Sequence, residues 1–301
     1  MPSRFSSPDE ASIHLEAITA KTFDLFELLW DHTYYTLRTY RDVESLDDDT
    51  KNCLVRGALR TVELEDSLTE GVEQTRRTLQ AWMQAFVVPP TQKNLVAHLS
   101  VQIFFFCIWI WVETWRDATA MLADRFETQY EYMAGLCEQY VEMHIAKQPF
   151  NFRDASCESQ ANTPPAFSLG SGVVTCLAAV VEKCRNSSVR RRCLATLQRI
   201  NLRGIFETNY LVAYLQAVIE YEEDIARELT MSGGELPGPS EFQAREIPEA
   251  ARLLEVVMSP SYRCENFEFY KSKQVEMLYA ARDFAGSSDE IALGKKVVQI
   301  H

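Results

Sequence analysis

Five residues with chemically useful side chains recur at helical spacing in the most aromatic part of the chain: His98, Gln102, Phe105, Trp109 and Glu113. At about 100° per residue they share one face of a helix. His98 and Glu113 are of the types that polarise a carbonyl group or transfer a proton, so they are candidate catalytic residues. Gln102, Phe105 and Trp109 are candidate substrate-binding residues, because rigid rings keep a cavity open. We therefore expect this face to line a ligand cavity.

The same segment has a simpler interpretation as a core helix. The ten residues from Ile103 to Val112 are all apolar, and a helix that is apolar all round is normally buried. Aromatic stripes belong to a core more often than to a pocket. Ten apolar residues are also fewer than the ~20 that a membrane-spanning helix needs, so we expect no membrane span.

A second stripe of phenol rings lies on a late amphipathic segment. Tyr210, Tyr214 and Tyr221 share one helical face. We expect Tyr210 and Tyr214 to take part in substrate binding, because buried phenols need hydrogen-bond partners. The alternative is a helix edge whose hydroxyl groups are in water.

The other polar clusters have structural interpretations. DDDTK at 47–51 resembles the aspartate-rich magnesium motif of class I terpene cyclases, but their second metal motif is missing and a helix cap explains the segment. The arginines at 190–192 and the acidic residues at 222–224 are interpreted as solvated helix surfaces. The eight cysteines form no C-x-x-C pair, and no nucleotide-binding or metal motif is present. We therefore expect no cofactor and no metal.

The elements that position these residues are mostly helical. Apolar periodicity predicts a first helix from Pro8 to about Arg41, a second that ends near Phe86, and a third that starts near Thr91 and continues to Lys147. Three shorter helical segments follow, and RLLEVVM and NFEFYK alternate like strands. We predict an all-α bundle of antiparallel helix pairs with a small C-terminal β-hairpin. It forms one domain over 1–301, with a long-helix half (1–147), a second helical half (167–230) and the hairpin (251–273).

Composition limits the partners of the chain. Its 301 residues include 43 acidic and 30 basic ones, which give a net charge of -13. This balance is unfavourable for nucleic acid, because binding rests on Lys and Arg at the phosphates. The first residues contain no apolar signal region, so we expect an intracellular protein of the cytoplasm or nucleus that is not secreted. The expected partner is an apolar small molecule, with no direct contact to nucleic acid, and a homodimer is left open.

Residues 167–224 look like the regulatory region of fungal zinc-binuclear-cluster transcription factors. The similarity rests on VVEKCRNSSVRRRCLATLQR (180–199), a Gly-aromatic-Glu step at 204–207, and a helix that ends in Glu-Glu. IPEAARLLEVVMSPSYRCENFEFYKSK (247–273) resembles the closing hairpin of that family, and FSSPDEASIHLEAI (5–18) resembles the start of its first helix. The resemblance implies an all-helical domain, nuclear regulation and sensing of a small molecule.

Two departures from that family shape the functional hypotheses. The chain holds no cluster of six closely spaced cysteines, and its central helix is loaded with Phe and Trp. The first hypothesis is a cofactor-independent cyclase, pericyclase or isomerase of fungal secondary metabolism, derived from a transcription-factor-like domain. The alternative is a transcriptional regulatory or interaction domain that acts without direct DNA contact.

Overall fold

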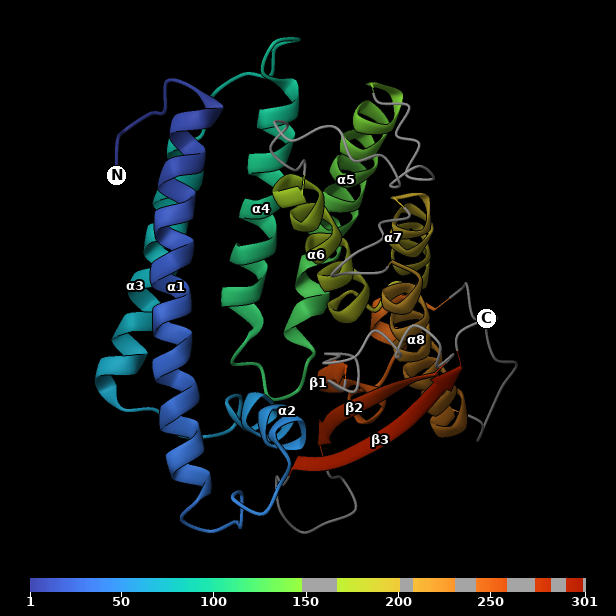
Figure 1. The fold of residues 1–301 in the computed structure, drawn as a ribbon. Helices are drawn as coiled ribbons and strands as arrows, with labels where there is room; N and C mark the ends of the chain where they lie inside the picture. The colour runs from blue at the N-terminus through green and yellow to red at the C-terminus, as the bar shows by residue number, and fades with distance from the viewer. Residues whose placement is uncertain (148–166, 201–207, 231–241, 259–273, 283–290, 300–301) are drawn as a thin grey trace, which may run out of the picture.

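The computed structural model describes residues 1–147, 167–200, 208–230, 242–258, 274–282 and 291–299 (Figure 1). In these residues eight α-helices precede a small C-terminal sheet, so the predicted mostly helical fold class is confirmed. The helices are α1 (Pro8–Leu37), α2 (Asp48–Ala58), α3 (Asp66–Ala85), α4 (Leu95–Thr114), α5 (Glu127–Lys147), α6 (Phe167–Lys183), α7 (Ser187–Ile200) and α8 (Thr208–Thr230). The 3-10 helix η1 (Leu122–Phe126) lies between α4 and α5, and the 3-10 helices η3 (Ala244–Glu246) and η4 (Glu249–Ala251) lie between α8 and the sheet.

Two of the predicted long helices are each divided by a turn. The second becomes α2 and α3, and the third becomes α4, η1 and α5. Two arginines hold these turns together: Arg116 donates to the carbonyl oxygen of Val62 at 2.9 Å, and Arg60 donates to those of Thr114 at 3.0 Å and Asp117 at 3.2 Å. The helices end there because these distant side chains satisfy carbonyl groups that would otherwise need a further helical turn.

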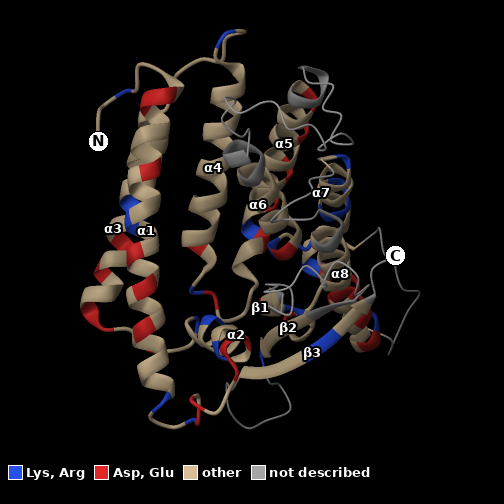
Figure 2. Ribbon diagram, viewed as in Figure 1, with Lys and Arg blue, Asp and Glu red and all other residues tan. Residues whose placement is uncertain are grey.

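Helix α4 lies in the middle of the bundle and packs against α1, α3, α5 and α6 (Figure 1). It shows no charged residue before Glu113, close to its C-terminal end (Figure 2). By length and composition this 20-residue helix is apolar enough to cross a membrane. The expectation of no membrane span counted only the ten-residue apolar run and so underestimated the length of the apolar helix. Core helices of water-soluble proteins meet the same criterion, and the absence of a membrane span stays a prediction.

The C-terminal strands β1 (Leu253–Met258), β2 (Gln274–Arg282) and β3 (Ile291–Gln299) form an antiparallel sheet in the order β1-β2-β3. The predicted RLLEVVM strand corresponds to β1, whereas NFEFYK lies outside the described residues. The other two strands occupy a region where the sequence pattern was mixed. Helix α2 packs against this sheet.

A buried charge network joins the helices of the second half. Glu222 on α8 accepts from Arg185 at 2.8 Å and from Arg190 at 2.5 Å, and all three side chains are at most 1% exposed. Beside it, Glu223 is buried against Arg191 at 2.8 Å. The interpretation of these acidic and basic runs as solvated surfaces is therefore wrong for these residues. Arg190, Glu222 and Glu223 are buried because their charges meet partners across the α7–α8 interface. Arg192 pairs instead with Glu138 on α5, and Asp224 is 61% exposed, as expected for a solvated surface.

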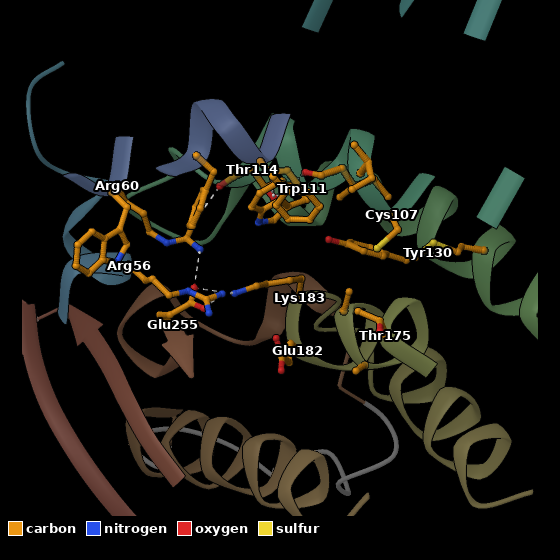
Figure 3. Close-up of a pocket in the computed structure, with 18 of the residues that line it drawn as sticks. Arg56, Arg60, Cys107, Trp111, Thr114, Tyr130, Thr175, Glu182, Lys183 and Glu255 are labelled. Atoms are coloured by element: carbon orange, nitrogen blue, oxygen red, sulfur yellow. Dashed lines mark hydrogen bonds and ion pairs between the residues drawn. The ribbon is translucent and has the colours of Figure 1, made fainter. Parts of the chain in front are cut away.

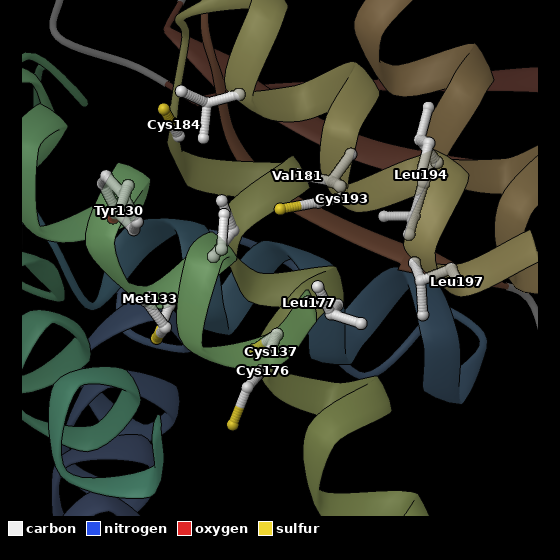
Figure 4. Packing of buried hydrophobic residues seen from close by; sticks show 14 of the residues in the cluster. Tyr130, Met133, Cys137, Cys176, Leu177, Val181, Cys184, Cys193, Leu194 and Leu197 are labelled. Atoms are coloured by element: carbon white, nitrogen blue, oxygen red, sulfur yellow. The ribbon is translucent and has the colours of Figure 1, made fainter. Parts of the chain in front are cut away.

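The core of this half also contains several cysteines that pack as small apolar residues. Cys137, Cys176, Cys184 and Cys193 lie among leucine and valine side chains (Figure 4). All four are free and buried. Burial raises the pKa of the Cys184 thiol to about 11, which keeps it protonated and unreactive at neutral pH.

Candidate functional site

A cavity of about 720 Å3 lies between α1, α4, α5 and α6, with residues from α2 and β1 at one end (Figure 3). Small-molecule sites typically measure about 300–1,000 Å3, so its size suits such a ligand. Its lining in the described part of the chain consists of Phe23, Phe26, Glu27, Trp30, Asp31, Arg56, Arg60, Cys107, Ile108, Ile110, Trp111, Thr114, Tyr130, Met133, Thr175, Ala178, Ala179, Glu182, Lys183 and Glu255.

Large aromatic and aliphatic side chains form one part of the wall. The ring of Trp111 on α4 lies 5.2 Å from that of Phe26 and 5.7 Å from that of Phe23, measured between centroids. Phe23 is 52% exposed, so this edge of the wall reaches solvent. Ile108 and Met133 add aliphatic surface further in. Rings held in mutual contact resist collapse into the cavity, and the wall therefore suits an apolar ligand.

The opposite end of the cavity holds a buried cluster of charges around Glu255. One carboxylate oxygen pairs with Arg56 at 2.6 Å, and the other lies 3.6 Å from Arg60 and 3.8 Å from Lys183. Burial opposes ionisation of Glu255, but the three cations outweigh it and lower its pKa. Burial lowers the pKa of Lys183 and of Arg60, because the attraction of the shared Glu255 carboxylate offsets only part of the cost of burying their charges.

Two further side chains on the wall could take part in proton transfer or hydrogen bonding. The Tyr130 hydroxyl points into the cavity (Figure 3), is buried and has no hydrogen-bond partner. Burial raises its pKa, so the phenol stays a hydrogen-bond donor at neutral pH. Burial also raises the pKa of Glu182, which favours the protonated acid. The site therefore combines a donor and a carboxyl group of altered acidity.

The two candidate catalytic residues do not line this cavity. His98 is 7% exposed and lies against Phe86, with ring centroids 5.1 Å apart, and burial lowers its pKa. Glu113 is half-buried and pairs with Arg76 at 3.5 Å. The fifteen positions between His98 and Glu113 correspond to roughly 22 Å along a helix, so the structure does not bring them to one reacting bond.

The candidate substrate-binding residues of the same face lie in packed surroundings. Phe105 is 3% exposed and stacks on Trp82, with ring centroids 4.8 Å apart. Trp109 stacks on Phe105 at 5.9 Å and meets Phe126 edge-on at 5.3 Å. Gln102 is half-buried and, like these rings, is not part of the described cavity lining. The packing of this face of α4 therefore matches the simpler interpretation of the segment, that of a core helix.

The tyrosines on one face of α8 lie in different surroundings. Tyr214 is 2% exposed in the core, where burial raises its pKa well above the ordinary value, and it is not part of the described cavity lining. The side chain of Tyr210 lies outside the described residues. The Tyr221 hydroxyl donates to the hydroxyl of Tyr279 at 3.0 Å, so it links α8 to the sheet.

Sequence reasoning selected the right helix and missed its cavity-facing side, where Trp111 and Thr114 lie. Periodicity cannot choose a face on a helix that is apolar all round. The charged end of the cavity did leave signals in the sequence. Arg56 and Arg60 are four residues apart in an otherwise apolar run, and Glu255 interrupts an apolar strand. Charges inside apolar segments indicate buried ion pairs or a site.

Within the described residues, no group of three or more His, Cys, Asp or Glu side chains is placed to hold a metal ion. Comparisons with protein-family models, with curated proteins and with solved structures find no match to this chain. The functional argument therefore rests on the cavity and its charged end.

Proposed function

We propose that this chain binds an apolar small molecule in the cavity between α1, α4, α5 and α6. The observation that carries the proposal is the cavity of about 720 Å3 with the rings of Phe26 and Trp111 in contact on its wall. A soluble ligand without apolar surface would gain little from such a wall, whereas burial of apolar area is worth about 25 cal/mol per Å2.

We further propose that the ligand is a flexible metabolite of fungal secondary metabolism and that the cavity folds it into a reactive conformer. The accessible reactions are a cyclisation, a pericyclic reaction or an isomerisation, which rearrange atoms without a redox cofactor. Tyr130 supports this because its free hydroxyl can polarise a carbonyl oxygen. Glu182 supports it because a carboxyl group of raised pKa can give a proton to one atom and accept one from another. His98 and Glu113 have no such position.

A regulatory role is the second candidate, and the buried network favours it. Arg185, Arg190 and Glu222 belong to the segments that resemble fungal zinc-cluster regulators. Because these side chains are buried, the similar residues are ones that pack inside the fold. A similarity at such positions supports a similar fold. In that role the chain senses a ligand in the same cavity and acts on a protein partner without direct DNA contact.

Ligand binding is tested with N-phenyl-1-naphthylamine, a neutral apolar dye whose emission rises in apolar surroundings. The unmodified protein is expected to bind it saturably. Ala179→Trp places a large ring in the cavity and is expected to weaken dye binding by at least about tenfold, while Ala250→Trp on the exposed surface leaves it unchanged. Equal binding by both variants, with both folded by circular dichroism, would contradict the proposal.

The two roles are separated by deletion of the gene in its producing fungus. Loss of one metabolite while the transcripts of neighbouring biosynthetic genes stay normal is the outcome expected for an enzyme. A fall in those transcripts is the outcome expected for a regulator and would overturn the enzymatic proposal.

A further inference from the structure

Two cations at the charged end of the cavity have unused hydrogen-bonding capacity. Arg60 gives one nitrogen, Nη1, to the carbonyl groups of Thr114 and Asp117, whereas its Nη2 lies 3.6 Å from Glu255 and its buried Nε has no partner. Lys183 donates to the carbonyl group of Leu254 at 3.2 Å. The distances of 3.6 and 3.8 Å from Glu255 exceed those of hydrogen bonds, so both cations retain free donors.

The charge balance at this end is also incomplete. Arg56, Arg60 and Lys183 surround Glu255, and Glu182 is the only other carboxyl group on this inner part of the described lining. Arg56 pairs with one oxygen of Glu255, so Arg60 and Lys183 share the other at 3.6 and 3.8 Å, and burial raises the pKa of Glu182, which favours its uncharged form. The remaining acidic residues of the lining, Glu27 and Asp31, are exposed on α1, where water screens them. A buried cation without its own counter-ion is costly, and an anion from outside would compensate it.

We propose that the cavity recognises an apolar carboxylic acid, with its carboxylate at Arg60 and Lys183 and its apolar chain along Phe26, Trp111 and Met133. This inference rests on the proposed ligand binding and names the class of ligand. Nη2 of Arg60 and Nζ of Lys183 lie 3.6 and 3.8 Å from the same oxygen of Glu255, so both can donate to one carboxylate. The free hydroxyl of Tyr130 lies on the wall away from the cations, where it donates to a second oxygen of the ligand.

The side chain of Arg60 is 8% exposed, which distinguishes this end from a surface patch of arginines. Its position is fixed from two sides, by the carbonyl groups after α4 and by Glu255 on β1. A carboxylate would therefore meet donors that are already oriented, and little side-chain entropy is lost on binding. A phosphate dianion fits less well, because its second charge would face Glu255 and Glu182.

The test compares three molecules with the same chain and different headgroups: dodecanoate, dodecanol and dodecylamine. Each is titrated against the complex of the protein with N-phenyl-1-naphthylamine at pH 8, with dodecanoate and dodecylamine below their micellar concentrations and dodecanol below its solubility limit. We expect dodecanoate to displace the dye at a concentration at least about tenfold lower than dodecanol, because charged hydrogen bonds discriminate by this amount. Lys183→Met, which keeps the apolar stem, is expected to abolish most of this preference, measured within the variant as the ratio of the dodecanol and dodecanoate concentrations that displace half of the dye.

The matched control is Lys21→Met, which removes the same charge from an exposed position of α1 and is expected to keep the preference. Circular dichroism shows in every case whether a variant is folded. Equal displacement by dodecanoate and dodecanol, or an unchanged preference in Lys183→Met, would overturn the carboxylate inference and leave apolar ligand binding standing. Stronger displacement by dodecylamine would overturn it in favour of recognition by Glu182, Glu27 and Asp31. No dye binding by the unmodified protein would refute the proposed function itself.

Discussion

The buried pair of arginines around Glu222 gives the strongest prediction about stability. The carboxylate of Glu222 accepts from Arg185 at 2.8 Å, from Arg190 at 2.5 Å and from the backbone N–H of Leu253 at 2.9 Å. It therefore connects α8 to α7, to the segment before α7 and to β1. Glu222→Gln keeps the size of the side chain and removes its charge. Two buried guanidinium groups then lose their counter-ion.

The magnitude follows from the acidity of the carboxyl group. Burial alone would raise the pKa of Glu222, but Arg185 and Arg190 outweigh burial and lower it from 4.5 to about 2. This difference corresponds to about 3 kcal/mol of stability at pH 7. Breaking a buried pair by removing one partner costs about 3–5 kcal/mol, in agreement. Because the pKa is lowered in the folded state, this stability is complete above about pH 5 and is lost as the pH falls from 4.5 towards 2.

The assay is urea unfolding, followed by tryptophan fluorescence, at pH 7 and at pH 3. Glu222→Gln is expected to lower the free energy of unfolding by about 3 kcal/mol at pH 7 and by about half of that at pH 3. The control is Asp224→Asn on the same helix, whose side chain is 61% exposed and which should change stability by less than about 0.5 kcal/mol. A loss no larger than that of the control, or a loss independent of pH, would refute the electrostatic explanation.

Two further predictions use the same assay. Gly57→Ala would place a Cβ 2.8 Å from the Cβ of Ala280, so we expect the free energy of unfolding to fall by about 1–3 kcal/mol. The control is Gly135→Ala, whose Cβ meets open space and which should raise the free energy of unfolding by up to about 1 kcal/mol through helix propensity. Equal effects of the two variants would contradict the packing of α2 on the sheet. The guanidinium of Arg252 is buried and makes five hydrogen bonds. Arg252→Lys should therefore lower the free energy of unfolding by about 3–5 kcal/mol. The control, Arg245→Lys on the exposed surface, should lower it by less than about 0.5 kcal/mol. A tolerated Arg252→Lys would show that the guanidinium is not required there.

The sequence predicted the helices well where their own periodicity determines them. The helix α1 begins as expected, with the Ser7 hydroxyl accepting from the backbone N–H of Glu10 at 3.2 Å, and it buries Leu15, Ile18 and Leu29. Its limits follow from residues within a few positions of each other, which a single sequence contains.

Features that depend on distant residues could not be predicted in the same way. The turn after α2 is fixed by Arg116, and its partner Val62 lies 54 positions away. The burial of Glu222 depends on Arg190, 32 positions away. A local pattern of charges predicts solvation because it does not contain the opposing charge that makes burial possible. The choice between the two faces of α4 likewise depends on where α1 and α6 pack against it.

The residues that line the cavity come from distant parts of the chain, and this bears on both functional hypotheses. Lys183 and Glu255, which belong to its charged end, lie in the segments for which we propose a resemblance to fungal regulators, next to the buried network of Arg185 and Glu222. The ring of Trp111 lies outside those segments. Arg56 and Arg60 of the charged end also lie outside them. On our proposal, the charged end holds the carboxylate, and the rings from α1 and α4 determine which apolar acid fits. The resemblance therefore bears on how the second half is stabilised, while the identity of the ligand has to be sought through the aromatic wall.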